Sequence, residues 1–149
     1  MTPPAFRLLM QATGLTLRAA AVFLNVRYDS VESWSQGRRT PPPGALAQLR
    51  ALYRQQLRTA AEAGLLQAEM DSVHGTGHRL EVGAVVDDHE AQALGWPSLG
   101  AQHMVVAMVV AQADQPISVV PRGATLLSAA AAGAHEPPAR PRNDKTRPR

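Results

Sequence analysis

The spacing of apolar residues near the start of the chain predicts a short amphipathic helix. Phe6, Leu9 and Met10 recur at i, i+3 and i+4, which places them on one face of a helix. The hydroxyl of Thr2 is followed by two prolines, whose missing N–H groups cost nothing at a helix start, and this pattern is typical of a capped N-terminus. Gly14 stands where a glycine commonly ends a helix.

Two further short helices are predicted before residue 37. Thr16 can cap a helix over residues 17–24, whose small central alanines let another helix approach closely. Asn25 follows, and asparagine is one of the few non-glycine residues that tolerate a left-handed conformation. The next segment, residues 28–36, has large apolar side chains three positions apart on one face: Val31 and Trp34.

A much longer helical pattern follows three prolines at positions 41–43. It predicts a helix over about residues 44–70, with Gly64 as the point where it could be interrupted. Its apolar stripe consists of Leu46, Leu49, Tyr53, Leu57 and Ala60. The other face carries arginines at i, i+4 spacing, which suit either a solvated face, the interpretation we favour, or a ridge facing phosphates: Arg50, Arg54 and Arg58.

The second half of the chain mixes strand and helix patterns. Residues 79–86 alternate, which predicts a strand with one apolar face: Leu80, Val82, Ala84 and Val86. Acidic residues at 87–90 suit the start of a short helix, and residues 117–120 suit a last strand. The valine-rich run 104–110 is apolar all round and fits a buried strand or a helix; a capping Ser98 favours a helix through Gln112. The expected fold class is mainly α with a small α+β part.

The charge distribution divides the chain into three parts. Residues 1–70 hold eight arginines and four acidic residues, residues 71–133 hold two arginines and six acidic residues, and residues 134–149 hold five basic and two acidic residues. We therefore expect an N-terminal module with its long helix at 1–70, a second module at 71–133 and a disordered basic tail at 134–149. Fourteen of the 15 basic residues are arginine, which suits bidentate contact with phosphate or guanine.

Several function classes find no support in the sequence. The chain has no cysteine, and its longest apolar run, 104–111, is far shorter than the roughly 20 residues that span a bilayer, so we expect a cytoplasmic protein that does not bind membranes. No glycine-rich phosphate loop or nucleophile elbow is present, which argues against an enzyme and against a cofactor. The spacing of the histidines and the nearby acid is not that of zinc ligands, so we expect no metal site and predict that these residues lie on the surface: His74, His78, His89 and Glu90.

A set of small, apolar and turn residues stands at regular spacing without a gap from Phe6 to Pro42: Gly14-Leu15-Thr16, Ala20-Ala21, Leu24-Asn25-Val26, Val31, Trp34 and Gly37-Arg38-Arg39-Thr40-Pro41. This set resembles the helix-turn-helix of the Cro/cI-type (XRE-like) repressors. The resemblance implies an N-terminal helix-turn-helix bundle. The second helix of the helix-turn-helix pair would enter the major groove of DNA. The chain departs from the family at Leu17, where glutamine is frequent, and at Arg27, where a Ser or Thr cap is usual and Asp29 could instead cap a slightly later start.

The resemblance assigns candidate DNA contacts to two groups of residues. The outward positions of the recognition helix would contact base edges: Arg27, Tyr28, Asp29, Glu32 and Ser33. The helix start and the turn after Gly37 would contact phosphates: Thr16, Arg18, Arg38 and Arg39. Two acidic residues on a DNA-facing surface require compensation by the neighbouring arginines. The alternative is an ordinary solvated face of a three-helix packing.

The segment that begins at Trp34 and continues into the second half of the chain resembles a narrower group, the anti-CRISPR-associated repressors and related small regulators with a C-terminal dimerisation module. The matching residues are Trp34, Gly37 and Pro43, the long helix, one strand, and then Gly95-Trp96, Ser98 and Gln102. One strand and one valine-rich helix cannot cover their own apolar surface, so residues 79–112 are expected to pair across a two-fold axis. The candidate interface residues are Leu80, Val82, Val86, Met104, Val106 and Val109.

These patterns predict a sequence-specific DNA-binding transcriptional regulator, a homodimeric (auto)repressor on a palindromic operator. Double-stranded DNA and a second copy of the chain are the expected partners. Two other classes remain open: an antitoxin-like protein–protein interaction module with autoregulatory DNA binding, and an RNA-binding regulator, which the arginine-rich tail would suit.

Overall fold

The computed structural model describes residues 2–75 and 79–124. Its first 35 residues form three helices of eight residues each: α1 (Ala5–Ala12), α2 (Leu17–Leu24) and α3 (Tyr28–Ser35). The expected cap at Thr2 is wrong, because the N-cap is Pro4 in an extended conformation with no side-chain hydrogen bond. A residue before a proline is disfavoured in the helical conformation, so the two prolines keep Thr2 and Pro3 outside the helix.

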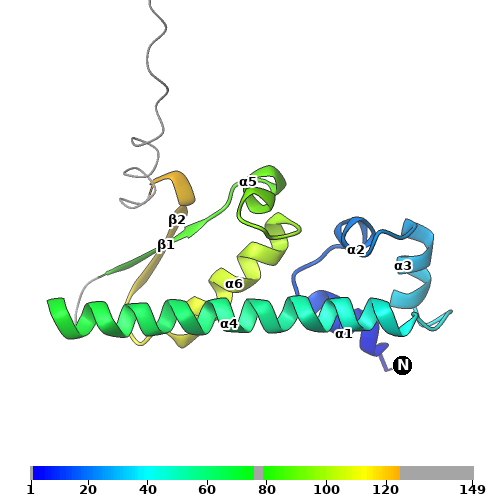
Figure 1. Cartoon of the computed structure of the whole chain (residues 1–149), viewed down its shortest axis with the longest axis horizontal. Coiled ribbons are helices and arrows are strands. Elements are labelled where there is room, and N and C mark those ends of the chain that lie inside the picture. Colours follow the sequence, from blue (N-terminus) through cyan, green and yellow to red (C-terminus); the bar gives the residue numbers. More distant parts are fainter. Residues whose placement is uncertain (1, 76–78, 125–149) are drawn as a thin grey trace, which may run out of the picture.

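The longest element is α4 (Pro43–His74), an uninterrupted helix of 32 residues, which is about 48 Å at 1.5 Å per residue. Gly64 does not break it, and it extends four residues beyond the predicted end at residue 70. The short helices lie over its N-terminal half, and the remaining elements lie over its C-terminal half on the same side (Figure 1). The boundary predicted at residue 70 therefore falls inside one continuous helix.

The buried face of α4 differs from the predicted stripe. Its buried residues are Ala45, Leu49, Leu52, Gln56 and Ala60, whereas Leu57 is 45% exposed. The predicted stripe and the buried one share Leu49 and Ala60 and differ at the other positions. The buried stripe could not be found from the spacing of apolar residues, because one of its members, Gln56, has a polar side chain.

The C-terminal elements form a strand–helix–helix–strand unit. β1 (Leu80–Ala84) is followed by α5 (Asp88–Ala93), α6 (Leu99–Gln112), β2 (Ile117–Pro121) and the short 3-10 helix η1 (Arg122–Ala124). The strands pair in parallel, from Leu80 opposite Ile117 to Ala84 opposite Pro121. The valine-rich run is helical as expected, and Ser98 caps α6 by accepting a hydrogen bond from the Ala101 N–H. The chain is mainly helical with a small sheet, which confirms the predicted mainly α class with a small α+β part, whereas the parallel pairing of β1 with β2 within one chain was not predicted.

The end of β1 departs from the predicted alternation. Val85, not Val86, is buried, and Val86 is 66% exposed. The pairing with β2 ends at Ala84, and side chains of α6 then bind the Val85 backbone: its N–H donates to Oε1 of Gln102, and its carbonyl lies 2.8 Å from Nε2 of His103. These contacts with α6 redirect the chain, so the period-two pattern stops one residue before Val86.

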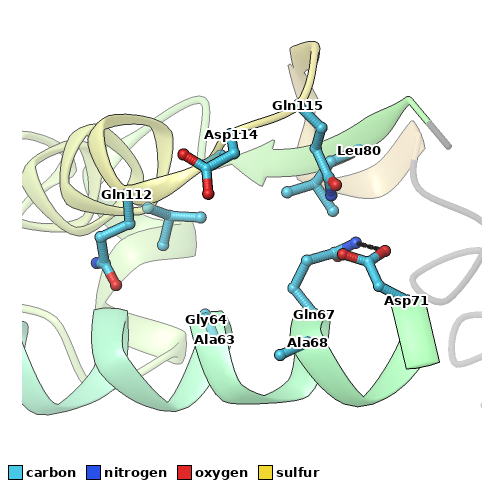
Figure 2. A pocket seen from close by; sticks show the side chains of 11 residues that line it. Ala63, Gly64, Gln67, Ala68, Asp71, Leu80, Gln112, Asp114 and Gln115 are labelled. Carbon is cyan, nitrogen blue, oxygen red and sulfur yellow. Dashed lines mark hydrogen bonds between the residues drawn. The ribbon is translucent and has the colours of Figure 1, made fainter. Parts of the chain in front are cut away.

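A cavity separates the C-terminal half of α4 from the end of α6, the loop after it and the start of β1 (Figure 2). Its volume is about 280 Å³. It is lined by apolar residues, including Leu80 and Val109, together with Gln and Asp side chains.

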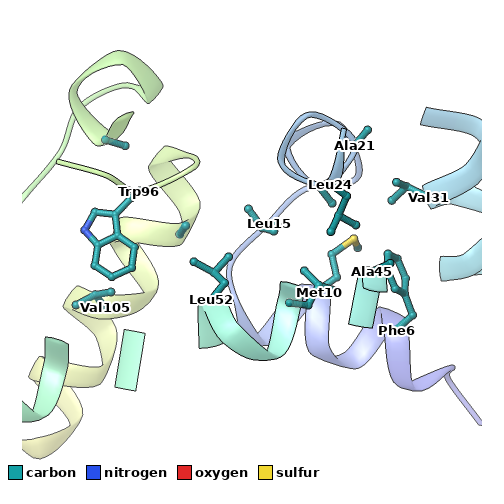
Figure 3. Close-up of a cluster of buried hydrophobic side chains, with 14 of the residues drawn as sticks. Phe6, Met10, Leu15, Ala21, Leu24, Val31, Ala45, Leu52, Trp96 and Val105 are labelled. Atoms are coloured by element: carbon teal, nitrogen blue, oxygen red, sulfur yellow. The ribbon is translucent and has the colours of Figure 1, made fainter. Parts of the chain in front are cut away.

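One continuous apolar core joins the two halves of the chain. It extends from Phe6, Met10 and Val31 through Leu52 to Trp96 and Val105 (Figure 3). At the junction, a Cβ added to Gly14 or to Gly100 would overlap the backbone carbonyl oxygen of the other glycine. Only glycine at both positions lets the α1–α2 turn and the first turn of α6 approach this closely.

The fully buried Gln56 holds the same junction through two hydrogen bonds. Its Nε2 donates to the carbonyl of Thr13 at 2.8 Å and to the carbonyl of Ala101 at 3.0 Å. The amide of α4 thus bridges the end of α1 and the start of α6. Among the described helices, none is long and apolar enough to cross a membrane.

Candidate nucleic-acid interface

The turn between α2 and α3 has three residues, Asn25, Val26 and Arg27. Asn25 adopts the left-handed conformation at φ 54° and ψ 49°, and the Val26 N–H donates back to the carbonyl of Ala21. At the other end of α2, Oγ1 of Thr16 accepts a hydrogen bond from the Ala19 N–H at 3.1 Å. Both predictions from the sequence, the cap at Thr16 and the left-handed Asn25, are confirmed.

Buried side chains hold α3 against the other short helices. Trp34 packs edge-to-face on Phe6, with ring centroids 5.5 Å apart and an interplanar angle of 77°. Val31 is fully buried, and the small Ala20 and Ala21 on α2 are buried as well. One face of α3 is therefore anchored in the core, and the opposite face remains outside.

The start of α3 differs from the expectation for Asp29. The helix begins at Tyr28 with Arg27 as its N-cap, and no side chain caps it. Asp29 lies within the first turn instead, where a carboxylate interacts favourably with the positive end of the helix dipole.

The chain after α3 folds back along the helix. Gly37 has a positive φ of 74°, and the N–H groups of Arg38 and Arg39 both donate to the carbonyl of Ser33. Nη2 of Arg39 then donates to Oγ of Ser30 at 3.1 Å, near the start of α3. Sequence reasoning missed Ser30, because no helical period relates residues 30 and 39; the only signal was the glycine that reverses the chain.

Arg38 forms an ion pair with Glu32, with its Nη2 3.8 Å from Oε2. The side chains of Arg38 and Glu32 remain 60% and 37% exposed, so the pair is solvated and contributes little stability. It does, however, offset the negative charge of Glu32 on this face. The compensation that the sequence required is therefore present at one of the two acidic residues.

The remaining candidates for DNA contact lie on the outer side of α2 and α3. Arg27, Tyr28 and Asp29 are exposed, and Ser33 is half-buried. Arg18 is exposed and lines a shallow hollow beside the turn together with Tyr28. The predicted base-contact and phosphate-contact residues thus lie on α3, in the turns on either side of it, and at the start of α2, where Thr16 and Arg18 are exposed.

The candidate dimer residues divide by burial within the single chain. Val106 is buried, and Val109 packs against the core. Leu80, Val82 and Met104 are half-buried, and Val86 is exposed. Of the six, Val86 is therefore the residue most available to a partner.

The acidic cluster at residues 87–90 has a structural role. Oδ1 of Asp87 caps α5 by accepting from the Glu90 N–H at 2.7 Å, and Oε2 of Glu90 accepts from the N–H of Val86, the residue before the cap, at 2.9 Å. Oδ1 of Asp88 accepts from the Leu99 N–H at 2.7 Å. In residues 2–75 and 79–124, no group of three or more His, Asp or Glu side chains could hold a metal ion.

Other predicted features lie apart from this interface or beyond the described residues. Arg50, Arg54 and Arg58 are exposed on α4. His78 and the tail at 134–149 lie outside the described residues. No protein-family model matches the chain, and its comparison with curated proteins gave no significant match.

Proposed function

We propose that this protein is a sequence-specific DNA-binding transcriptional regulator, acting in the cytoplasm as a homodimeric repressor of a palindromic operator. The observation that carries the proposal is the α2–turn–α3 unit, with its three-residue turn and left-handed Asn25. Two helices joined by a three- to four-residue turn are the unit that places a recognition helix in the major groove. The resemblance to Cro/cI-type repressors covers the same residues.

The electrostatics of the α3 face support the same proposal. Arg27 and Arg39 are exposed at the two ends of α3 and Arg18 is exposed on α2, while Arg38 pairs with Glu32. The hydrogen bond to Ser30 holds the Arg39 guanidinium beside α3, where it can contact a phosphate at the groove edge. Glu32 and Asp29 would accept hydrogen bonds from cytosine N4 in the groove.

Repression then needs no cofactor. One α3 helix per subunit enters the major groove, and the two helices of a dimer lie about 34 Å apart on a two-fold symmetric site. Pairing two half-sites supplies the discrimination that one short helix lacks, because the energies of separate base contacts roughly add. A dimer bound at a promoter blocks polymerase by occupying its site.

The test measures binding of the full chain to its own upstream DNA by fluorescence anisotropy at several salt concentrations. Arg39→Ala should weaken binding to all sequences alike and lower the salt-dependence slope by about one unit, since one phosphate contact is lost. Glu32→Gln should change the preference at one base position, by about 1–3 kcal/mol. Arg58→Ala, an equally charged change on the exposed side of α4, is the matched control.

Equal binding by wild type, Arg39→Ala and Glu32→Gln would contradict the assignment. An equal loss of affinity in Arg39→Ala and Arg58→Ala would also contradict it, because binding would then depend on the net charge of the chain and not on where the arginine lies. The transcript of the same region serves as a competitor: tighter binding to the transcript than to the duplex would favour the RNA-binding class instead.

A further inference from the structure

The cavity between α4 and the end of α6 has no part in the proposed DNA contacts. Small residues keep its α4 side open, among them Ala63, Gly64 and Ala68 (Figure 2). A Cβ on Gly64 would lie 3.1 Å from Oε1 of Gln112, so the absence of a side chain there makes room for this amide. Nε2 of Gln112 donates to the carbonyl of Met108 at 3.0 Å.

Two carboxylates line this cavity and both retain acceptor capacity. Oδ1 of Asp71 accepts from Nε2 of Gln67 at 2.9 Å, which leaves its second oxygen available. Asp114 is exposed at the opposite wall and has no hydrogen bond or ion pair with any part of the chain that the structure describes. The two acids come from different elements, α4 and the loop after α6, and both line the cavity.

Gln115 adds a donor that has no acceptor. Its side chain extends from the loop toward α4 (Figure 2), and its Nε2 is buried without a hydrogen-bond partner. A buried amide N–H left unpaired is costly, and native proteins rarely keep one. The terminal torsion of a glutamine rotates over a broad range, so this N–H can turn to donate a hydrogen bond to an acceptor atom in the cavity.

The charge and size of the cavity define the class of ligand. The lining holds two carboxylates and no lysine, arginine or histidine, so an anion is disfavoured and a cation is favoured. A metal ion does not fit, since the described residues offer no group of three His, Asp or Glu ligands. At about 280 Å³ the cavity is just below the usual range for drug-sized ligands.

We propose that this cavity binds a small organic cation whose ammonium or guanidinium group lies between Asp71 and Asp114 and whose acceptor oxygen takes the N–H of Gln115. Charge-assisted hydrogen bonds to the two carboxylates supply most of the affinity. The ligand would join α4 to the loop after α6. This inference does not depend on the proposed DNA binding.

The test is isothermal titration calorimetry on the full chain with three small probes. We expect 4-aminobutanamide, which carries an ammonium group and an acceptor oxygen, to bind, and succinate not to bind. Asp71→Asn and Asp114→Asn should each raise its Kd about tenfold, the loss expected for one charge-assisted hydrogen bond. The matched control Glu69→Gln changes an exposed acid of α4 that does not line the cavity, and it should leave the Kd unchanged.

Two further variants separate the parts of the proposal. Gln115→Met should weaken the binding of 4-aminobutanamide but not that of putrescine, because putrescine has two ammonium groups and no acceptor oxygen. Ala63→Leu should fill the cavity and abolish binding of both amines while the chain stays folded by circular dichroism. Absence of binding of both amines to folded wild type at millimolar concentration would overturn the proposal. Equal Kd values for wild type and both asparagine variants would also overturn it.

Discussion

The close contact between Gly14 and Gly100 makes the replacement Gly100→Ala a test of how the two halves of the chain are joined. Gly100 lies in the first turn of α6, and its backbone conformation is one that alanine also adopts. In an exposed helix this change would stabilise the protein by about 0.5–1 kcal/mol, because glycine loses more conformational freedom on folding. Here the added methyl group would overlap the backbone carbonyl oxygen of Gly14.

The overlap should outweigh the gain in helix propensity. Overpacking a well-packed site typically costs about 1–3 kcal/mol. The upper part of that range applies, because the obstructing atom belongs to backbone and cannot rotate away as a side chain would. Separating the two segments would also strain the Gln56 hydrogen bonds to Thr13 and Ala101. We expect a net loss of about 2 kcal/mol in the free energy of unfolding.

Urea unfolding followed by circular dichroism measures this loss. For a slope of about 1–3 kcal/mol per molar, the midpoint should fall by about 1 M with the slope unchanged. Gly44→Ala is the matched control, since a Cβ there meets nothing within 4 Å, and it should keep or raise the midpoint. A midpoint for Gly100→Ala at or above that of wild type would refute the packing of the α1–α2 turn on α6.

Two other predictions follow from burial and hydrogen bonding. Gln56→Leu should lower the free energy of unfolding by about 1–3 kcal/mol, because the hydrogen bonds from Gln56 to the carbonyls of Thr13 and Ala101 are lost; an unchanged urea midpoint would show that the junction does not depend on Gln56. Val86→Asp should leave the chain folded but produce a monomer with weakened operator binding, whereas Val73→Asp on α4, which is also well exposed, should not. Sedimentation velocity at tens of micromolar would decide this, and a wild-type monomer or a dimeric Val86→Asp variant would contradict the dimer surface.

Val86 is preferred to Val106 for that experiment because Val86 is exposed in the single chain and Val106 is buried. Val106 is 7% exposed within one subunit, so an aspartate there would unfold the protein whether or not it dimerises. The two-stranded parallel sheet adds a second reason to expect a partner. Parallel sheets normally have both faces covered, yet Val119 of β2 is 54% exposed.

Capping and turn residues were sufficient to predict most helices and strands and the α2–turn–α3 unit of the candidate site. Thr16 and Ser98 cap their helices through their own hydroxyl oxygens, and Asn25 turns the chain because its backbone tolerates a positive φ. Such signals depend on a residue and its neighbours within four positions, so they can be read along the chain. The placement of the α2–turn–α3 unit followed from them, whereas the candidate DNA contacts on it came from the resemblance to Cro/cI-type repressors.

Contacts between distant segments could not be predicted in the same way. The buried stripe of α4 includes Gln56 because Thr13 and Ala101, 43 and 45 positions away, supply its acceptors. The end of β1 depends on Gln102 of α6, and the position of the Arg39 guanidinium depends on Ser30. A buried polar group is stable only where its partners meet it, and those partners are brought together by packing, which no period in the sequence records.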